Sequence, residues 1–178
     1  MSKKVEVKIE RMHPDVVIPS YNHEDDSGMD VRAFFHDEWI KKTYDDLEVS
    51  EWDSNRGYDL FPGGRAIIPT GIKVAIPDGY EIQVRPRSGM AIKQGLTVLN
   101  TPGTVDAGYR GEIGIIVYNS NPSYDSKSYN SNGLVEINHG DRIAQLVLQE
   151  VPKVEWVEVE SVDETTRGDG GFGSTGVS

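Results

Sequence analysis

Three polar segments of the sequence combine residue types that can bind phosphate or activate water. The first is residues 86–91, where Arg87, Ser88 and Gly89 follow a predicted strand. A guanidinium, a hydroxyl and exposed backbone N–H groups at such a turn can hold phosphate oxygens. The same residues also fit an ordinary helix start, with Ser88 as N-cap of a short helix through Lys93.

The second segment is residues 100–112, in which Gly103 and Gly108 bracket a tight reversal with Asp106 between them. A carboxylate presented in such a turn can act as a general base on a water molecule. A plain β-hairpin with an aspartate turn explains the same pattern. The spacing leaves both interpretations open.

The third segment is the glycine-rich tail, residues 167–176. It contains a G-x-G-x-x-G match from Gly168 to Gly173, but no strand and helix flank the match and the P-loop lysine is missing. A disordered terminus is one interpretation. The other is a flap that wraps a polyphosphate and stacks an aromatic ring on a base, because the segment carries Arg167, Ser174, Thr175 and Phe172.

The composition excludes several other classes of chemistry. There are no cysteines, which rules out disulfides, thiolate zinc sites and cysteine nucleophiles. The four histidines show no metal-ligand spacing, and no G-x-S-x-G motif is present. A formal net charge of -11 argues against a broad nucleic-acid or anionic-membrane surface. We find no membrane-spanning apolar run and no signal peptide, so we expect a cytoplasmic protein.

Short strands account for most of the remaining sequence. The expected strands alternate apolar and polar residues or are rich in β-branched residues, with glycine and proline between them. They are Val5–Ile9, Arg65–Ile68, Gly71–Ile76, Tyr80–Arg85, Glu112–Asn119, Gly133–Ile137, Arg142–Val151 and Val154–Val159, the last with a break in its alternation. Many short strands at this spacing indicate an all-β barrel or sandwich.

Two segments interrupt the strand pattern. Residues 36–58 are acidic and predict a short helix or a hairpin insertion, and residues 120–132 are polar and predict a surface loop. We therefore expect one domain over residues 1–163, carrying both insertions, and a flexible C-terminal arm over residues 164–178.

Taken together, the motifs resemble those of the homotrimeric dUTP pyrophosphatases, the dUTPases. Five segments stand in that family's order: residues 27–33 (SGMDVRA), 86–89 (PRSG), 103–111 (GTVDAGYRG), 140–146 (GDRIAQL) and the tail from Arg167 to Gly176. The resemblance covers nearly the whole chain apart from the two insertions. Ser27 stands where the family often has alanine, a change that we expect to be tolerated.

The resemblance implies a jelly-roll-like β-barrel of the dUTPase β-clip type, with one short helix, and a homotrimer with active sites between subunits. It implies that Asp106 activates the attacking water and that Asp30 organises waters and polar groups nearby. The metal would be Mg²⁺, held by the triphosphate and waters with no direct protein ligand. The implied contacts to substrate come from Arg87, Ser88, Gly89, Asn100, Gly103, Val105, Tyr109, Gln145, Arg167, Phe172, Gly173, Ser174 and Thr175.

The implied reaction is hydrolysis of dUTP to dUMP and pyrophosphate. Backbone groups of residues 103–111 and Asn100 would read uracil, and Tyr109 would leave no room for a ribose 2′-hydroxyl. One alternative is a dCTP deaminase or bifunctional deaminase on the same fold. Another is a nucleotide-gated regulatory protein that binds a protein partner through the insertions. We expect no nucleic-acid or membrane partner.

Overall fold

The computed structural model describes residues 3–35, 57–122 and 133–171. Within these ranges the chain forms eleven strands and one short helix, which confirms the predicted mostly-β fold. The strands are β1 (Lys8–Arg11), β2 (Met29–Arg32), β3 (Tyr58–Leu60), β4 (Arg65–Pro69), β5 (Ile72–Ala75), β6 (Tyr80–Arg85), β7 (Leu96–Val98), β8 (Gly103–Val105), β9 (Gly114–Asn119), β10 (Val135–Ile137) and β11 (Arg142–Glu150); the helix is α2 (Ser88–Gln94).

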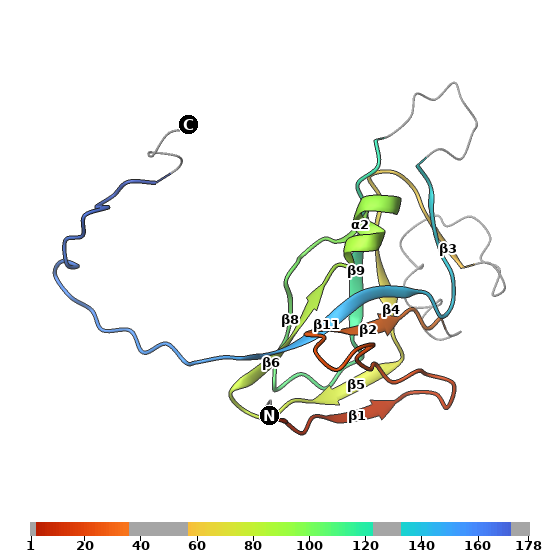
Figure 1. Cartoon of the computed structure of the whole chain (residues 1–178), viewed down its shortest axis with the longest axis horizontal. Helices are drawn as coiled ribbons and strands as arrows, with labels where there is room; N and C mark the ends of the chain where they lie inside the picture. The colour runs from red at the N-terminus through yellow and green to blue at the C-terminus, as the bar shows by residue number, and fades with distance from the viewer. Residues whose placement is uncertain (1–2, 36–56, 123–132, 172–178) are drawn as a thin grey trace.

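The strands form four antiparallel sheets (Figure 1). The largest has the order β2-β11-β6-β8, the second has the order β4-β9-β7, and β1-β5 and β10-β3 form two-stranded sheets. Strands far apart in sequence, such as β2 and β11, are neighbours. This order is jelly-roll-like, although the described strands do not close into one continuous barrel.

Alternating burial along the strands builds the core between the sheets. In β9, Ile115, Val117 and Asn119 are buried, whereas the residues between them are partly exposed. The inward positions of β5, β6, β7 and β11 contribute further isoleucine, valine and leucine side chains to the same cluster. Because successive strand residues point to opposite faces, this pattern leaves the outer face of the largest sheet free for polar groups.

The predicted strands are mostly present, with one clear error. β6 has the predicted bounds, and β4, β5, β9, β10 and β11 lie within a residue or two of theirs. β1 begins at Lys8 rather than at Val5. Residues 154–159 form no strand, and Trp156 is 91% exposed. The strand prediction is wrong there: no strand of the described residues pairs with this segment.

The segment around Asp106 is not a simple hairpin. β8, which precedes Asp106, pairs with β6 in the largest sheet, whereas the following strand β9 pairs with β4 and β7. The turn therefore carries the chain from one sheet to another. The predicted helix or hairpin within residues 36–58 and the loop at 120–132 lie largely outside the described residues, as does the tail from Phe172 to Ser178.

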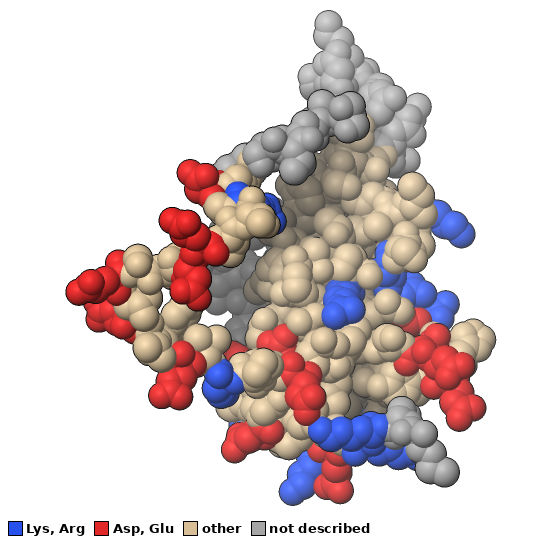
Figure 2. Space-filling view, turned by 60° about the vertical axis from the view of Figure 1, so that its left-hand side comes forward, with Lys and Arg blue, Asp and Glu red and all other residues tan. Residues whose placement is uncertain are grey.

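The chain leaves the body of the molecule directly after β11. Every residue from 152 to 169 is exposed, and this segment runs away from the sheets (Figure 1). Acidic side chains are spread along it (Figure 2). We refer to residues 152–171 as the arm.

Candidate active site

The carboxylate of Asp30 is a hub that accepts hydrogen bonds from four side chains in three parts of the chain. It lies in β2, and its side chain is 8% exposed. The donors are Arg87 Nε to Oδ1 at 2.9 Å, Arg142 Nη1 to Oδ2 at 3.1 Å, Asn22 Nδ2 to Oδ2 at 3.3 Å and Gln145 Nε2 to Oδ1 at 3.4 Å. Both carboxylate oxygens are therefore occupied.

These contacts keep Asp30 ionised. Burial of the carboxyl group opposes ionisation, but the hydrogen bond from Asn22 and the positive charges of Arg87 and Arg142 outweigh it, so the pKa of Asp30 lies below its ordinary value. Ionised Asp30 in turn fixes both guanidinium groups, and Arg87 Nη1 also donates to the carbonyl oxygen of Arg142 at 3.1 Å.

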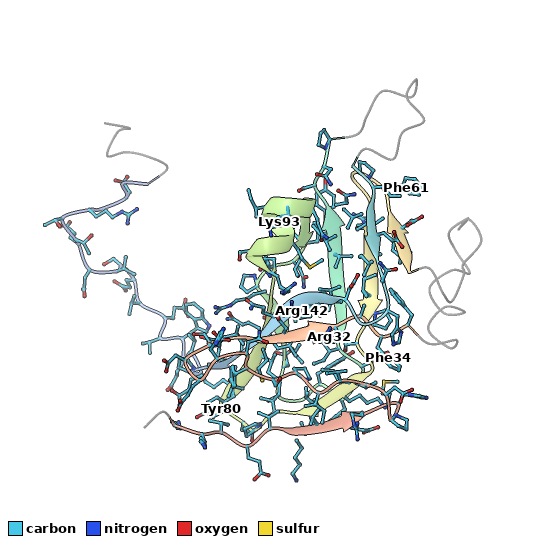
Figure 3. All side chains as sticks on the ribbon, turned by 45° about the vertical axis from the view of Figure 1, so that its right-hand side comes forward. Arg32, Phe34, Phe61, Tyr80, Lys93 and Arg142 are labelled. Carbon is cyan, nitrogen blue, oxygen red and sulfur yellow. The ribbon has the colours of Figure 1, made fainter. Side chains whose placement is uncertain are left out.

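The sheet register explains why these residues meet. On β11, Gln145 lies opposite Asp30 of β2 on one side and opposite Arg85 of β6 on the other. Arg87 follows the end of β6 by two residues, and Arg142 begins β11. Figure 3 shows Arg142 beside Arg32, its register partner on β2. Residues distant in sequence are thus held at one end of a rigid sheet.

The hub forms one wall of a recess of about 390 Å³, which we call the Asp30 recess. Its lining residues are Asn22, His23, Asp26, Asp30, Arg87, Ser88, Gly89, Arg142 and Gln145. Ser88 and Gly89 open helix α2, where the first backbone N–H groups have no intrahelical acceptor. The helix start predicted at Ser88 is present, but Arg87 occupies the N-cap position and makes no side-chain capping bond.

Asp106 lies in a different place, at the other end of β6. Val105 pairs with Ile82, so Asp106 lies next to Glu81 at the start of β6. Asp106 lines a pocket of about 500 Å³ together with Tyr80, Glu81, Val151 and Lys153. We call this the Asp106 pocket. Arg85 lies four residues after Glu81 along the extended strand, a distance of about 13 Å. Within the described chain, Asp106 therefore does not share a pocket with the predicted phosphate-binding residues.

Local hydrogen bonds hold the loop that carries Asp106. The backbone N–H of Tyr109 donates to Asp106 O at 3.0 Å, and Arg110 Nη1 donates to the carbonyls of Ala107 and Tyr109 at 2.6 and 2.7 Å. The Tyr109 hydroxyl donates to Glu112 O at 2.9 Å. The loop is therefore preorganised, and Asp106 itself is exposed.

The remaining predicted residues in the described chain lie near this loop or on the arm. Asn100 is exposed and its amide lies against Gly103, where a Cβ would come within 3.0 Å of Asn100 Nδ2. Val105 points into the core, and Tyr109 is 45% exposed. Arg167 is exposed on the arm, and its Nε donates to Gly170 O at 2.8 Å. The predicted tail residues Phe172, Gly173, Ser174 and Thr175 lie outside the described residues.

Four lining residues of the Asp30 recess were missed by the sequence analysis: Asn22, His23, Asp26 and Arg142. Arg142 belongs to the motif at residues 140–146, which also contains Gln145, but it was not predicted as a site residue. The other three come from the loop before β2, whose position depends on tertiary contacts.

The described residues contain neither a cluster of metal ligands nor a membrane-spanning helix. No three carboxylate, imidazole or thiolate side chains converge as metal ligands would in that part of the chain. None of its helices has the length and apolar character needed to cross a membrane.

Comparison with known proteins identifies the family. A family model described as dUTPase matches residues 53–176. The chain belongs to the dUTPase family. A deoxyuridine 5′-triphosphate nucleotidohydrolase from Fusobacterium nucleatum subsp. nucleatum is 46% identical over 175 residues, covering 98% of this chain and 99% of that protein. One from Wolinella succinogenes is 43% identical, covering 99% and 97%.

Solved structures of dUTPases share the fold of this family member. The dUTPase of Staphylococcus bacteriophage 80alpha, solved with dUPNHPP, superposes with a TM-score of 0.74 at 27% identity. The match covers 98% of this chain and 100% of the phage chain.

Proposed function

We propose that this member of the dUTPase family hydrolyses dUTP to dUMP and pyrophosphate. The observation that carries the proposal is the Asp30 recess, where two guanidinium groups fixed by one carboxylate lie beside Ser88, Gly89 and Gln145. Such a recess suits the phosphate chain of a nucleotide. The full-length similarity to bacterial deoxyuridine 5′-triphosphate nucleotidohydrolases supports deoxyuridine triphosphate as that nucleotide.

We propose further that the active site is divided between subunits of a homotrimer. The Asp30 recess and the Asp106 pocket lie at opposite ends of β6, so one chain does not bring Asp106 to the nucleotide in its own recess. The arm, with Trp156 91% and Val162 84% exposed, supports assembly because such side chains need a covering surface. In this assembly, Asp106 of one subunit faces the Asp30 recess of another.

In the proposed reaction, the Asp106 carboxylate accepts a proton from a water molecule, whose oxygen attacks the α-phosphorus in line. The bond from the α-phosphorus to the bridging oxygen breaks, and pyrophosphate leaves with the electron pair. Arg87, Ser88, Gly89 and Gln145 hold the phosphates, and Asp30 fixes the guanidinium groups. Arg167, Gly173, Ser174 and Thr175 close over the far phosphate while Phe172 covers the base, so residues 164–178 act as a flap on a domain of residues 1–163.

A charge argument supports Mg²⁺ as the cofactor. In the Asp30 recess, the positive charges of Arg87 and Arg142 are matched by Asp30 and Asp26, so with neutral His23 the recess has no net charge. A bound triphosphate is strongly anionic, and its charge needs a cation beyond what this recess supplies. Bound to the phosphates and waters, Mg²⁺ would neutralise the charge that develops on the leaving group.

β8 and the loops on either side of it are proposed to recognise the base and the sugar. Since the Val105 side chain is in the core, Val105 and Gly103 would contact uracil through backbone groups, beside the Asn100 amide. Cytosine would leave those groups unpaired, which can cost about 10⁴-fold in specificity. Tyr109 would exclude the ribose 2′-hydroxyl.

The test is pyrophosphate release from dUTP, dCTP, dTTP and UTP with Mg²⁺, for the natural chain and Asp106→Asn. We expect release from dUTP alone and a loss of at least about 10³-fold in the variant, with unchanged folding. Comparable release from dCTP or UTP would refute the specificity, and ammonia from dCTP would indicate a deaminase. We also propose a cytoplasmic location, which fractionation of the source cells would test.

A further inference from the structure

We propose that His23 is a further substrate-contacting residue, whose imidazole donates a hydrogen bond to the phosphate chain of the nucleotide in the Asp30 recess. The inference rests on the proposed function and adds a residue to its site. His23 lines the recess together with Arg87, Ser88, Arg142 and Gln145. It comes from the loop before β2, outside the five motifs of the sequence.

The backbone of His23 is held in place. Its N–H donates to the Asp26 carboxylate at 2.9 Å, and the Asp26 N–H donates to His23 O at 3.2 Å, which closes a tight turn. The preceding residue, Asn22, donates to the Asp30 carboxylate at 3.3 Å. The loop is therefore attached to the same carboxylate that fixes both arginines, so His23 keeps its place relative to them.

The His23 ring differs from the other two histidines that the structure describes. His13 accepts a hydrogen bond from the backbone N–H of Asp15 at 3.2 Å, and both His13 and His139 pack against Phe34. Among the described residues, the ring nitrogens of His23 have no hydrogen-bond partner. An imidazole carries at least one N–H donor in either protonation state. His23 thus offers a donor at the recess that no group of the described chain uses.

Phosphate oxygens are the acceptors that the recess suits. Its two guanidinium groups already donate to Asp30, and its formal charge is zero with neutral His23. An additional neutral donor improves phosphate binding without repelling the arginines. Because His23 is exposed, we expect an effect of about threefold to tenfold on affinity, which is smaller than the usual effect of a hydrogen bond to a charged acceptor.

The experiment compares two ligands across three variants. Dissociation constants are measured for α,β-imido-dUTP and for 2′-deoxyuridine, which lacks phosphates, with His23→Ala, His23→Gln and the control His13→Ala. We expect His23→Ala to weaken imido-dUTP binding about threefold to tenfold and leave deoxyuridine within about twofold. His23→Gln should recover part of the loss because its amide also donates, and His13→Ala should change neither constant.

Two results would overturn the role of His23. One is unchanged imido-dUTP affinity in His23→Ala, and the other is an equal loss for both ligands, which would indicate a collapsed loop. The same measurements on the natural chain show whether the His23 inference alone has failed or the proposed function has failed as well. If the natural chain neither binds imido-dUTP nor hydrolyses dUTP, the proposed function fails and the role of His23 with it. If it does both, only the His23 inference is at stake.

Discussion

The Asp30 carboxylate holds the recess together by accepting hydrogen bonds from Asn22, Arg87, Arg142 and Gln145. Its contribution to the proposed active site is to position other side chains. Removing its charge leaves two guanidinium groups close together without their counterion. Loss of Asp30 is therefore expected to affect both stability and phosphate binding.

We predict that Asp30→Asn lowers the free energy of unfolding at pH 7 by about 1–3 kcal/mol, the range for losing hydrogen bonds to a charged group. The pKa of Asp30 is lower in the folded than in the unfolded chain. Its stabilisation is therefore complete above the unfolded pKa, about 3.9, and is lost as the pH falls through the folded pKa. The gap between variant and natural chain should shrink below about pH 4.

Urea denaturation of both proteins across this pH range checks the prediction. Asp59→Asn is a matched control, because Asp59 is exposed on β3, and we expect it to change stability by less than about 0.5 kcal/mol. A difference for Asp30→Asn that stays the same from pH 7 to pH 3 would show that the carboxylate charge does not stabilise the fold.

The residues that form the site were only partly predictable from sequence. Arg87, Ser88 and Gly89 lie in a motif whose residue types suit phosphate binding, whereas Gln145 was implied by the family resemblance; the structure places all four in one recess. Asn22 and His23 lie in a polar loop with no such pattern. Their place in the recess depends on contacts such as Asn22 to Asp30, eight residues apart, which spacing alone does not reveal.

Strand prediction worked for every described strand of five or more residues, which are β4, β6, β9 and β11. Among the strands of three or four residues, β1, β5 and β10 were found because they lie in or beside longer predicted segments. β2, β3, β7 and β8 were missed. A strand this short has too few positions to show a period of two, and its pairing is decided by distant strands.

Buried Asn119 at the end of β9 connects three segments of the fold. Its Nδ2 donates to Leu60 O at 2.8 Å and Gly133 O at 2.7 Å, and its Oδ1 accepts from the N–H of Asn121 at 3.0 Å. The side chain is 0% exposed. It thus joins β9 to β3 and to the chain entering β10, so an apolar replacement removes three hydrogen bonds made by this buried side chain.

We predict that Asn119→Ala lowers the free energy of unfolding by about 2–4 kcal/mol, because buried polar groups lose their partners. Denaturant titration followed by circular dichroism measures the change. The control is Asn138→Ala at an exposed site, where we expect less than about 0.5 kcal/mol. Equal stabilities for the two variants would mean that the Asn119 network contributes nothing.

Two features of the molecule are not accounted for by a single subunit, and both indicate assembly into an oligomer. The Asp30 recess and the Asp106 pocket lie at opposite ends of β6. Residues 152–169 of the arm are exposed, and the strand-like residues 154–159 among them pair with none of the described strands. In a closed assembly of identical chains, each subunit would supply Asp106 to the Asp30 recess of a neighbour and a covering surface for a neighbour's arm.

The most direct test mixes two inactive variants, Asp106→Asn and Arg87→Ala, after denaturing and refolding them together. Each variant alone should have almost no dUTP hydrolysis. If each site takes Asp106 from one subunit and Arg87 from another, random mixing in equal amounts restores about one quarter of natural activity. Activity that stays at the level of the separate variants, in a mixture that has refolded and exchanged subunits, would contradict a divided site.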